Sequence, residues 1–294
     1  MSVAIIANPL AGRGRGQKTA QLTKELLTAQ NVDFEMLYTK HPGHAIELAQ
    51  RASQDHPIVA ALGGDGTIRE VLEGTWQSSA TLGIIPGGTG NDYARGLGIP
   101  RETKPAIEVL LDGKETLFDV GLHDNLVFGQ MASIGFSVDV LEYVNNHRDG
   151  VWKGSAAFLA GVVATIRNLR SWPVKITIDG TVIEQEVIAL FALNMPYGGG
   201  GMKFVPEARY DSGHFHLLLI SNIGKLDFAV TLPKIYSGKH VTHPAVTIVE
   251  GKEITIESDP LPIMIDGDVF PAKPFHVKIK PQAMRVLIPK TPAL

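Results

Sequence analysis

The chain has 294 residues, a length that favours two domains over one. Hydrophobic residues make up 44% and charged residues 19%, an ordinary balance for a globular protein with a sizeable core. The net charge of −3 argues against a nucleic-acid binder, which should carry a basic surplus. Because cysteine is absent, disulfides, thiolate catalysis and cysteine-bound zinc are excluded, and the composition suits the cytoplasm.

The first apolar segment, residues 3–7, lacks a basic leader and predicts a strand, not a signal peptide. No apolar stretch reaches transmembrane length. The best candidate, residues 155–166, is followed directly by Arg167 and Arg170. We therefore expect any membrane contact to be peripheral.

The N-terminal part alternates apolar runs with helical patterns. The predicted strands cover 3–7, 34–38, 58–62 and 81–85, and the predicted helices cover 17–30, 45–52 and 67–73. Residues 8–16 are expected to form a glycine-rich loop. This alternation predicts an α/β domain over residues 1–124, with a mostly parallel sheet that binds ligands at the carboxyl ends of its strands.

From about residue 125 the pattern changes to short alternating strands such as 174–178 and 254–256. Asp179-Gly180 and Asp266-Gly267 look like hairpin turns. Helical patterns are few, at 154–169 and at 226–237, where Pro233 interrupts. We expect an antiparallel β domain over 125–282, with residues 283–294 packing back on the first domain, and edge strands that could pair in a homodimer.

One glycine turn, Gly63-Gly64-Asp65-Gly66-Thr67, lies between a buried strand and a helix. Its glycines let a bulky anion approach the backbone amides, and the helix N-terminus favours phosphate. The spacing from Thr67 to Glu70 predicts a capping box at the start of the helix, and Gly74 predicts the end of the helix. Asp65 would repel phosphate unless a divalent cation lies between them. The alternative is a tight turn with Asp65 as a polar turn residue.

A second glycine turn, residues 86–92, repeats this pattern on the next strand. Gly88 and its neighbouring glycines leave the backbone amides accessible to a ligand. Thr89 can hydrogen-bond a phosphate, and Asn91-Asp92 precedes a short helix. Two such turns on neighbouring strands predict a paired phosphate cradle.

The loop at 8–16 is neither a dinucleotide fingerprint nor a P-loop, because Gln17 stands where a P-loop needs its second glycine. Arg13 and Arg15 suit the neutralisation of phosphate charge. The alternative is a solvated basic loop.

Four segments together resemble the diacylglycerol kinase catalytic family, which includes soluble bacterial lipid kinases and sphingosine kinases. They are NPLAGR at 8–13, TKHPGHA at 39–45, GGDGT at 63–67 and PGGTGND at 86–92. GGDGT is shared with NAD kinases and phosphofructokinases, whereas GTGND narrows the resemblance to lipid kinases. The resemblance covers nearly the whole chain, with two departures: Arg13 replaces the usual lysine, and Asp268 the usual glutamate of DGE.

The resemblance implies an NAD kinase- or phosphofructokinase-like N-terminal domain and a C-terminal β-sandwich. It also implies transfer of the ATP γ-phosphate to a lipid hydroxyl, with diacylglycerol as the leading acceptor and Mg²⁺ as cofactor. The implied base is Asp266, beside Asp268. Asp65, with Asp92 and Asp119, would organise magnesium and water, although Asp92 and Asp119 could equally be structural acids. Asp179 remains a turn residue.

The nucleotide site implied by the resemblance is drawn from both glycine turns and the two preceding loops. Its predicted residues are Asn8, Pro9, Gly12, Arg13, Thr39, Gly63, Gly64, Gly66, Thr67, Glu70, Gly88, Thr89, Asn91 and Asp92. The family has a functional lysine near the position of Lys153, and Trp152 and Lys153 could also touch lipid headgroups.

The segment from Asp211 to His216 has three interpretations. His214 and His216 could form a transition-metal pair, or they could be surface histidines of a strand. The family implies a third, a structural magnesium held by Asp211 and by the backbone carbonyls of His214 and His216.

The overall expectation is a cytoplasmic lipid kinase of the bacterial type that associates peripherally with the membrane bearing its lipid substrate and binds no nucleic acid. Two rival functions remain at this point. One is a kinase of a soluble acceptor, such as NAD or a sugar phosphate. The other is a catalytically inactive module that binds nucleotide or lipid.

Overall fold

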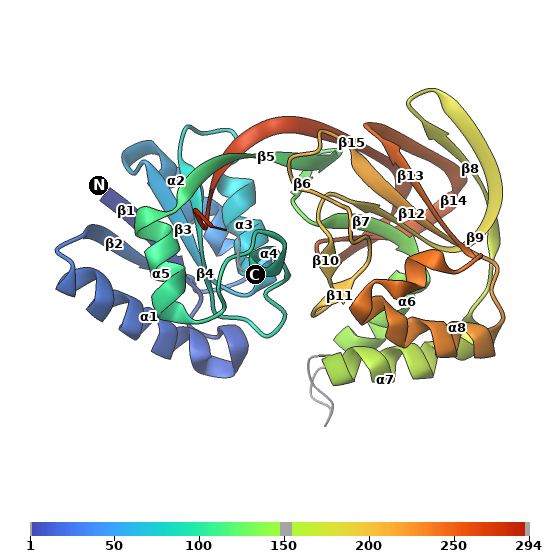
Figure 1. The fold of residues 1–294 in the computed structure, drawn as a ribbon, viewed down its shortest axis with the longest axis horizontal. Coiled ribbons are helices and arrows are strands. Elements are labelled where there is room, and N and C mark those ends of the chain that lie inside the picture. Colours follow the sequence, from blue (N-terminus) through green and yellow to red (C-terminus); the bar gives the residue numbers. More distant parts are fainter. Residues whose placement is uncertain (1, 148–154, 292–294) are drawn as a thin grey trace. The chain divides into compact units, whose positions relative to one another are not determined.

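The computed structural model describes residues 2–147 and 155–291 (Figure 1). The chain forms two compact units: Met1–Val120 with Pro281–Leu294, and Gly121–Lys280. Two strands, β5 (Lys114–His123) and β15 (Asp268–Ile288), contribute residues to both units.

The first unit has a sheet in the order β2-β1-β3-β4-β15, and all four neighbouring pairs are parallel. Its other strands are β1 (Ser2–Ala7), β2 (Asp33–Tyr38), β3 (Ile58–Gly63) and β4 (Thr81–Pro86). Its helices are α1 (Ala11–Ala29), α2 (His44–Asp55), α3 (Asp65–Thr75), α4 (Asp92–Gly96) and α5 (Thr103–Asp112).

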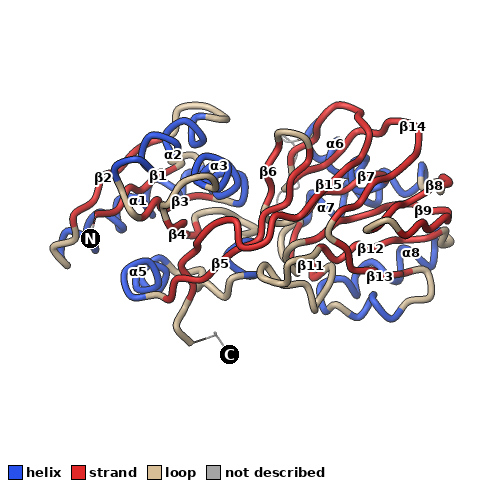
Figure 2. Tube along the Cα trace, turned by 90° about the horizontal axis from the view of Figure 1, so that it is seen from above, coloured by secondary structure: helices blue, strands red, loops and turns tan. Residues whose placement is uncertain are grey.

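The central strands of this sheet are apolar on both faces because helices cover both. Val3, Ile5 and Leu62 pack with Leu27 of α1 and Leu110 of α5 in one core cluster. Helices α2 and α3 pack against each other and against β1 and β3 (Figure 2). Continuous burial explains why these strands read as uninterrupted apolar runs.

Two local predictions for the first unit are wrong. Helix α1 begins at Ala11, so most of the predicted loop is its irregular first turn, in which Gly12 and Gly14 have left-handed φ values of 56° and 83°. Helix α3 does not stop at Gly74. A Cβ on Gly74 would lie 2.5 Å from the Ala49 Cβ, so glycine there permits the close packing of α3 on α2.

The second unit is built from antiparallel strands in the order β13-β12-β9-β7-β14-β15, with β8 paired to β9 and β14. The strands are β6 (Leu126–Phe128), β7 (Met131–Gly135), β8 (Trp172–Ile178), β9 (Thr181–Leu193), β10 (Tyr197–Gly198), β11 (Met202–Lys203), β12 (Phe215–Ser221), β13 (Val246–Gly251) and β14 (Glu253–Ile265). The helices are α6 (Phe136–Asn146), α7 (Ser155–Thr165) and α8 (Lys225–Thr231), with 3₁₀ turns η1 (Ile166–Asn168), η2 (Leu232–Ser237) and η3 (Lys239–Thr242).

The central sheet of the second unit is buried on both faces. Along β12, Leu217 and Leu219 belong to a core cluster shared with β8, β14 and β15. Leu218 points to the other face, into a cluster with Phe136 of α6 and Phe228 of α8. The alternation of side chains along a strand thus divides one apolar run between two cores.

Both predicted Asp-Gly hairpin turns are confirmed. Asp179-Gly180 joins β8 to β9 with φ values of 48° and 86°, and Asp266-Gly267 joins β14 to β15 with φ values of 45° and 90°. Two positive φ values define the type I′ turn that such pairs favour.

The helical pattern predicted over 226–237 is interrupted at Pro233, as expected. The α-helix ends at Thr231, Pro233 lies at the start of the 3₁₀ turn η2, and residues 232–237 are 3₁₀ rather than α-helical. Proline has no N–H to continue the α-helical hydrogen bonds. Among the described residues, no helix is both long and apolar enough to span a bilayer.

Candidate functional site

The loops after β1 and β3 meet where the strand order reverses. The chain leaves β1 toward β2 on one side of the sheet and leaves β3 toward β4 on the other, so the reversal lies between β1 and β3. The Asn8 Nδ2 donates a hydrogen bond to the Thr67 Oγ1 at 3.2 Å, and the Asn8 N–H donates to the Leu62 carbonyl at 2.9 Å. Parallel sheets bind ligands at this kind of reversal point.

The two glycine turns are in direct contact. The Gly87 N–H donates to the Gly63 carbonyl at 2.7 Å. A Cβ on Gly88 would lie 2.5 Å from the Gly64 Cα, and a Cβ on Gly12 would lie 2.3 Å from the Gly87 carbonyl oxygen. The structure therefore brings the loops after β1, β3 and β4 together, and only glycine allows this approach.

Asp65 links the first turn to the short helix after the second. Its Oδ1 accepts a hydrogen bond from the Tyr93 N–H of α4 at 3.1 Å. Burial raises the pKa of the Asp65 carboxyl, while the backbone N–H groups of Tyr93, Asp92 and Asn91 act in the opposite direction. Asn91 has a left-handed φ of 54°, and its Oδ1 accepts from the Gly88 N–H at 2.9 Å.

The capping box predicted for α3 is absent. Both carboxylate oxygens of Glu70 instead accept backbone N–H groups before and within α2, from Gly43 at 2.9 Å and from Ala45 at 3.1 Å. Glu70 thus fixes the start of α2, which begins after a left-handed glycine. The half-buried Thr39 donates its N–H to the Ala7 carbonyl at 3.0 Å.

A cavity of about 320 Å³ lies beside the second glycine turn and is lined by Arg15, which the sequence pattern singled out, and by Arg101, which it did not. The Arg15 guanidinium donates to the Gly88 and Gly12 carbonyls, each at 3.0 Å. Arg101 donates to the Thr89 carbonyl at 3.4 Å, and the cavity also reaches Thr103 at the start of α5. Arg101 lies outside every glycine motif, so only the fold places it there.

The two other predicted acids of this unit are buried. Asp92 is the first residue of α4 and lies 3.8 Å from the Arg95 Nε. Asp119 accepts the Gln282 N–H at 2.7 Å and so ties β5 to β15. Trp152, Lys153 and the Arg13 side chain lie outside the described residues.

Asp266 is buried in the second unit and points into the backbone of the segment before β7. Its Oδ2 accepts from the Gly129 N–H at 2.9 Å, and its Oδ1 accepts from Gln130 at 3.0 Å and Met131 at 2.8 Å. Three backbone donors hold the carboxylate in one orientation. Asp268 is exposed two residues later.

The oxygen ligands predicted around Asp211 are engaged. Arg209 binds both Asp211 oxygens, each at 2.9 Å, and the Ser212 Oγ donates to the His214 carbonyl at 2.9 Å. Magnesium binds through oxygen ligands, and an ion here would have to replace Arg209 at the Asp211 carboxylate, so the magnesium site that the resemblance implies stays a prediction. Burial lowers the pKa of His216, and the charge of His214 adds to this effect.

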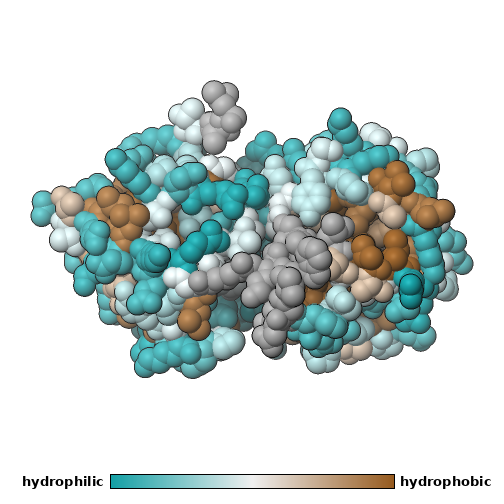
Figure 3. All heavy atoms as spheres, turned by 90° about the horizontal axis from the view of Figure 1, so that it is seen from below, coloured by the Kyte–Doolittle hydropathy of each residue, from teal (hydrophilic) through white to brown (hydrophobic). Residues whose placement is uncertain are grey.

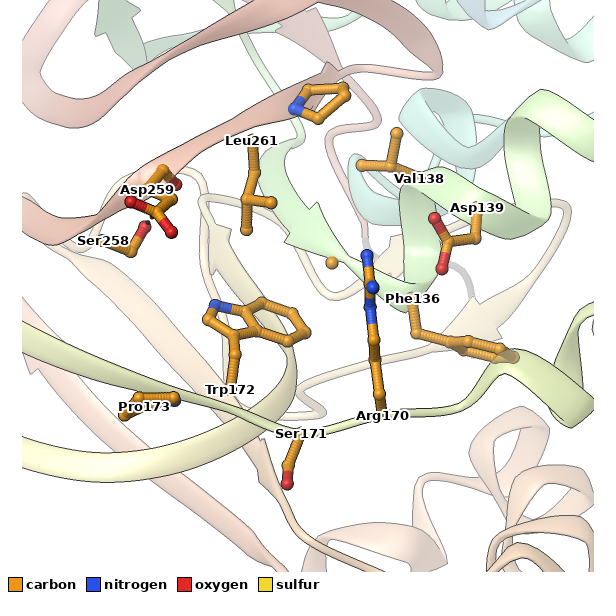
Figure 4. A pocket seen from close by; sticks show the side chains of 12 residues that line it. Phe136, Val138, Asp139, Arg170, Ser171, Trp172, Pro173, Ser258, Asp259 and Leu261 are labelled. Carbon is orange, nitrogen blue, oxygen red and sulfur yellow. Dashed lines mark hydrogen bonds between the residues drawn. The ribbon is translucent and has the colours of Figure 1, made fainter.

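A larger cavity, of about 710 Å³, opens in the second unit between α6, the start of β8 and the middle of β14 (Figure 4). Phe136, Trp172 and Leu261 give it apolar walls, and Arg170 and Asp139 face each other across one side. Burial raises the pKa of Asp139, and the charge of Arg170 opposes this. Its volume is in the range of small-molecule sites.

The first glycine turn allows a paired test. A Cβ on Gly63 would lie 2.5 Å from the Thr67 Oγ1, whereas a Cβ on Gly66 meets nothing within 4 Å. We expect Gly63→Ala to lower the melting temperature. Gly66→Ala should keep it, because alanine favours a helix, while weakening the binding of a polyphosphate at least about tenfold if phosphates occupy that open space. Unchanged polyphosphate binding in Gly66→Ala would place the phosphates elsewhere.

Two family models match the chain: the diacylglycerol kinase catalytic domain over residues 2–123, and the YegS C-terminal NAD kinase beta sandwich-like domain over residues 130–288. The diacylglycerol kinase of Staphylococcus haemolyticus (strain JCSC1435) is 31% identical over 90% of this chain and 81% of its own. The chain belongs to the diacylglycerol kinase catalytic family. This assignment makes it a lipid kinase and confirms the resemblance seen in its motifs.

Two further comparisons cover nearly the whole of this chain. The diacylglycerol kinase of Staphylococcus carnosus (strain TM300) is 29% identical over 97% of this chain and 94% of its own. A crystal structure of a Bacillus anthracis str. Sterne protein aligns with a TM-score of 0.83 and 26% identity, covering 99% of this chain and 98% of that one. The α/β unit and the β-sandwich unit thus both follow the family.

Proposed function

We propose that this lipid kinase transfers the γ-phosphate of ATP to the free hydroxyl of diacylglycerol and forms phosphatidic acid. The observation that supports this most is the contact between the two glycine turns, with the Gly87 N–H on the Gly63 carbonyl. Together they present bare backbone beside a cavity that holds Arg15 and Arg101. Backbone amides and guanidinium groups are the donors that polyphosphates need.

The first unit would bind the nucleotide. Arg15, fixed by two carbonyls, and Arg101 would offset phosphate charge, and Asn8 would hold Thr67 in place. Asp65 fits a magnesium ion. Burial disfavours the charged form of its carboxyl, and a bound cation would offset this effect by stabilising the carboxylate. Such an ion, held by Asp65 with Asp92 and Asp119, would neutralise charge on the transferring phosphoryl group.

Asp266 is the proposed base. Its carboxylate, fixed by the N–H groups of residues 129–131, would accept the proton of the attacking lipid hydroxyl. Phosphoryl transfer then forms the new O–P bond as the bond to ADP breaks, and the proton stays with Asp266 until it leaves to water. Asp268 would add negative charge beside the base.

Incubation of the protein with γ-labelled ATP and a lipid extract tests the reaction. We expect the label in phosphatidic acid, and label confined to the aqueous phase would favour a kinase of a soluble acceptor. Peripheral membrane association is part of the proposal, because Val163, Leu226 and Val230 of α7 and α8 are exposed at 65%, 86% and 67%. Hydrophobic side chains are exposed in patches on the surface seen in Figure 3. The protein should float with diacylglycerol-containing vesicles, and its recovery in the bottom fraction would contradict membrane association.

The 710 Å³ cavity is the proposed site for the apolar part of the acceptor. Gly135, at its wall, is four residues along β7 from Met131, which binds Asp266. Four strand residues span about 13 Å, a distance that an acyl chain covers easily.

Filling this cavity should change the acceptor preference. We expect Leu261→Trp to lower kcat/KM for long-chain diacylglycerol at least about tenfold and for a short-chain analogue much less, since only a long chain needs the space. Val182→Trp, on the exposed β8–β9 hairpin, is the matched control. Equal losses for both acceptors would show that the cavity does not take the chain.

A further inference from the structure

Three side chains that no motif of the kinase uses converge at the edge of the second unit. The His214 Nε2 lies 3.4 Å from one carboxylate oxygen of Glu250, and the His216 Nε2 lies 3.4 Å from the other. All the candidate ligand atoms are within 4.8 Å of one another. His216 is buried, His214 is half-buried and Glu250 is exposed, so an ion could enter from solvent.

The fold itself sets this convergence. His216 of β12 pairs directly with Glu250 of β13, which places their side chains on the same face of the sheet. His214 lies two residues before His216 and so points to that face as well. The sequence separates Glu250 from the histidines by more than thirty positions, and only the β12–β13 register brings it to them.

Two of the separations match a small tetrahedral ion, and the three ligand atoms as a set lie within 4.8 Å of one another, so the ion would draw them closer as it binds. Zinc binds imidazole nitrogen at about 2.0–2.1 Å, and two ligands of a tetrahedron at that radius are about 3.3–3.4 Å apart. Both His–Glu separations are 3.4 Å. Two imidazoles and one carboxylate are a donor set that zinc and its neighbours in the transition series accept and magnesium does not favour.

The competing oxygen set is poorer. Arg209 binds both oxygens of Asp211, and the His214 carbonyl accepts the Ser212 hydroxyl. A metal there would have to displace a charged bidentate partner. By contrast, the partner of both imidazoles is the Glu250 carboxylate itself, which a cation would share.

We propose that His214, His216 and Glu250 bind a divalent transition metal of the zinc type through side chains, with water at the remaining position. The ion would cross-link β13, the edge strand of the sheet, to β12. Its role would be structural and independent of the magnesium–nucleotide site. Glu207, whose charge also acts on His216, adds to the negative potential around the ion.

Cobalt(II), added to chelator-treated protein without nucleotide, tests this proposal. We expect the intense visible absorption of tetrahedral cobalt, saturating at one equivalent, removed by zinc and unaffected by excess magnesium. His214→Ala and Glu250→Gln should weaken cobalt binding at least about tenfold. Zinc should raise the melting temperature of the wild type by mass action and have a much smaller effect on these variants.

Two variants serve as matched controls. His243→Ala removes another histidine–carboxylate pair of the same unit, with Asp227 at 3.2 Å, and should leave cobalt binding unchanged. Asp211→Asn should also leave it unchanged. Absence of the visible band would overturn the proposal. A band that is lost in Asp211→Asn and kept in Glu250→Gln would also overturn it, because the metal would then be bound by the oxygen ligands of the loop.

Discussion

Asp266→Asn should lower kcat by about 10²–10⁴-fold, the range by which a general base accelerates a reaction. An amide cannot take the proton of the attacking hydroxyl. The effect should appear in kcat measured with saturating ATP and diacylglycerol, and the ATP affinity should stay near that of the wild type, since the proposed nucleotide residues all belong to the first unit.

The same substitution also affects stability, so a control is needed. An amide group would face the N–H donors of Gly129, Gln130 or Met131, and one unsatisfied buried donor costs about 1–3 kcal/mol. Asp179→Asn is the matched control, because Asp179 is in the same kind of hairpin turn and accepts the Lys252 and Glu253 N–H groups. It should keep full turnover per folded molecule. If Asp266→Asn does too, Asp266 is not the base.

Asp65→Asn should abolish magnesium-dependent transfer, with a loss in kcat/KM of at least about a hundredfold, or about 2.7 kcal/mol of transition-state stabilisation. The amide oxygen can still accept the Tyr93 N–H, so the turn should survive. Activity across a magnesium titration, with calorimetric ATP binding, would measure the effect. A variant rescued fully by excess magnesium would show that Asp65 only weakly assists the ion.

The stability of the same variant should depend on pH in a defined direction. Burial raises the pKa of Asp65, so the folded state retains this proton to higher pH than the unfolded chain. Its contribution to stability is therefore present at low pH and is lost as the pH rises through the raised pKa. We expect the free energy of unfolding of Asp65→Asn, measured with urea, to rise relative to that of the metal-free wild type as the pH increases from about 4 to about 8.

The strands and turns were the most predictable part of the molecule. Residues 58–62 form β3 because an uninterrupted apolar run fits a strand covered on both faces, and the following glycine turn could be read from its composition. The Asp-Gly pairs at 179 and 266 predicted hairpins because few other dipeptides accept two positive φ values. These signals lie in a few neighbouring residues, so a single sequence is enough to find them.

The errors concern residues whose partners are distant in sequence. Glu70 has the spacing of a capping box, but it binds Gly43 and Ala45 because α2 lies beside α3. Glu250 joins the two histidines only through strand register, and Arg101 reaches the glycine turn only after the chain has folded back. No periodicity encodes such contacts.

Strand β15 has a consequence for how the protein is made. Its residues Arg285 and Val286 pair with Thr81 and Leu82 of β4, and Gln282 binds Asp119. The ribosome therefore releases the whole second unit before it supplies the segment that covers β4. During synthesis the first unit therefore waits with the edge of β4 open, and an open strand edge is prone to pairing with other chains.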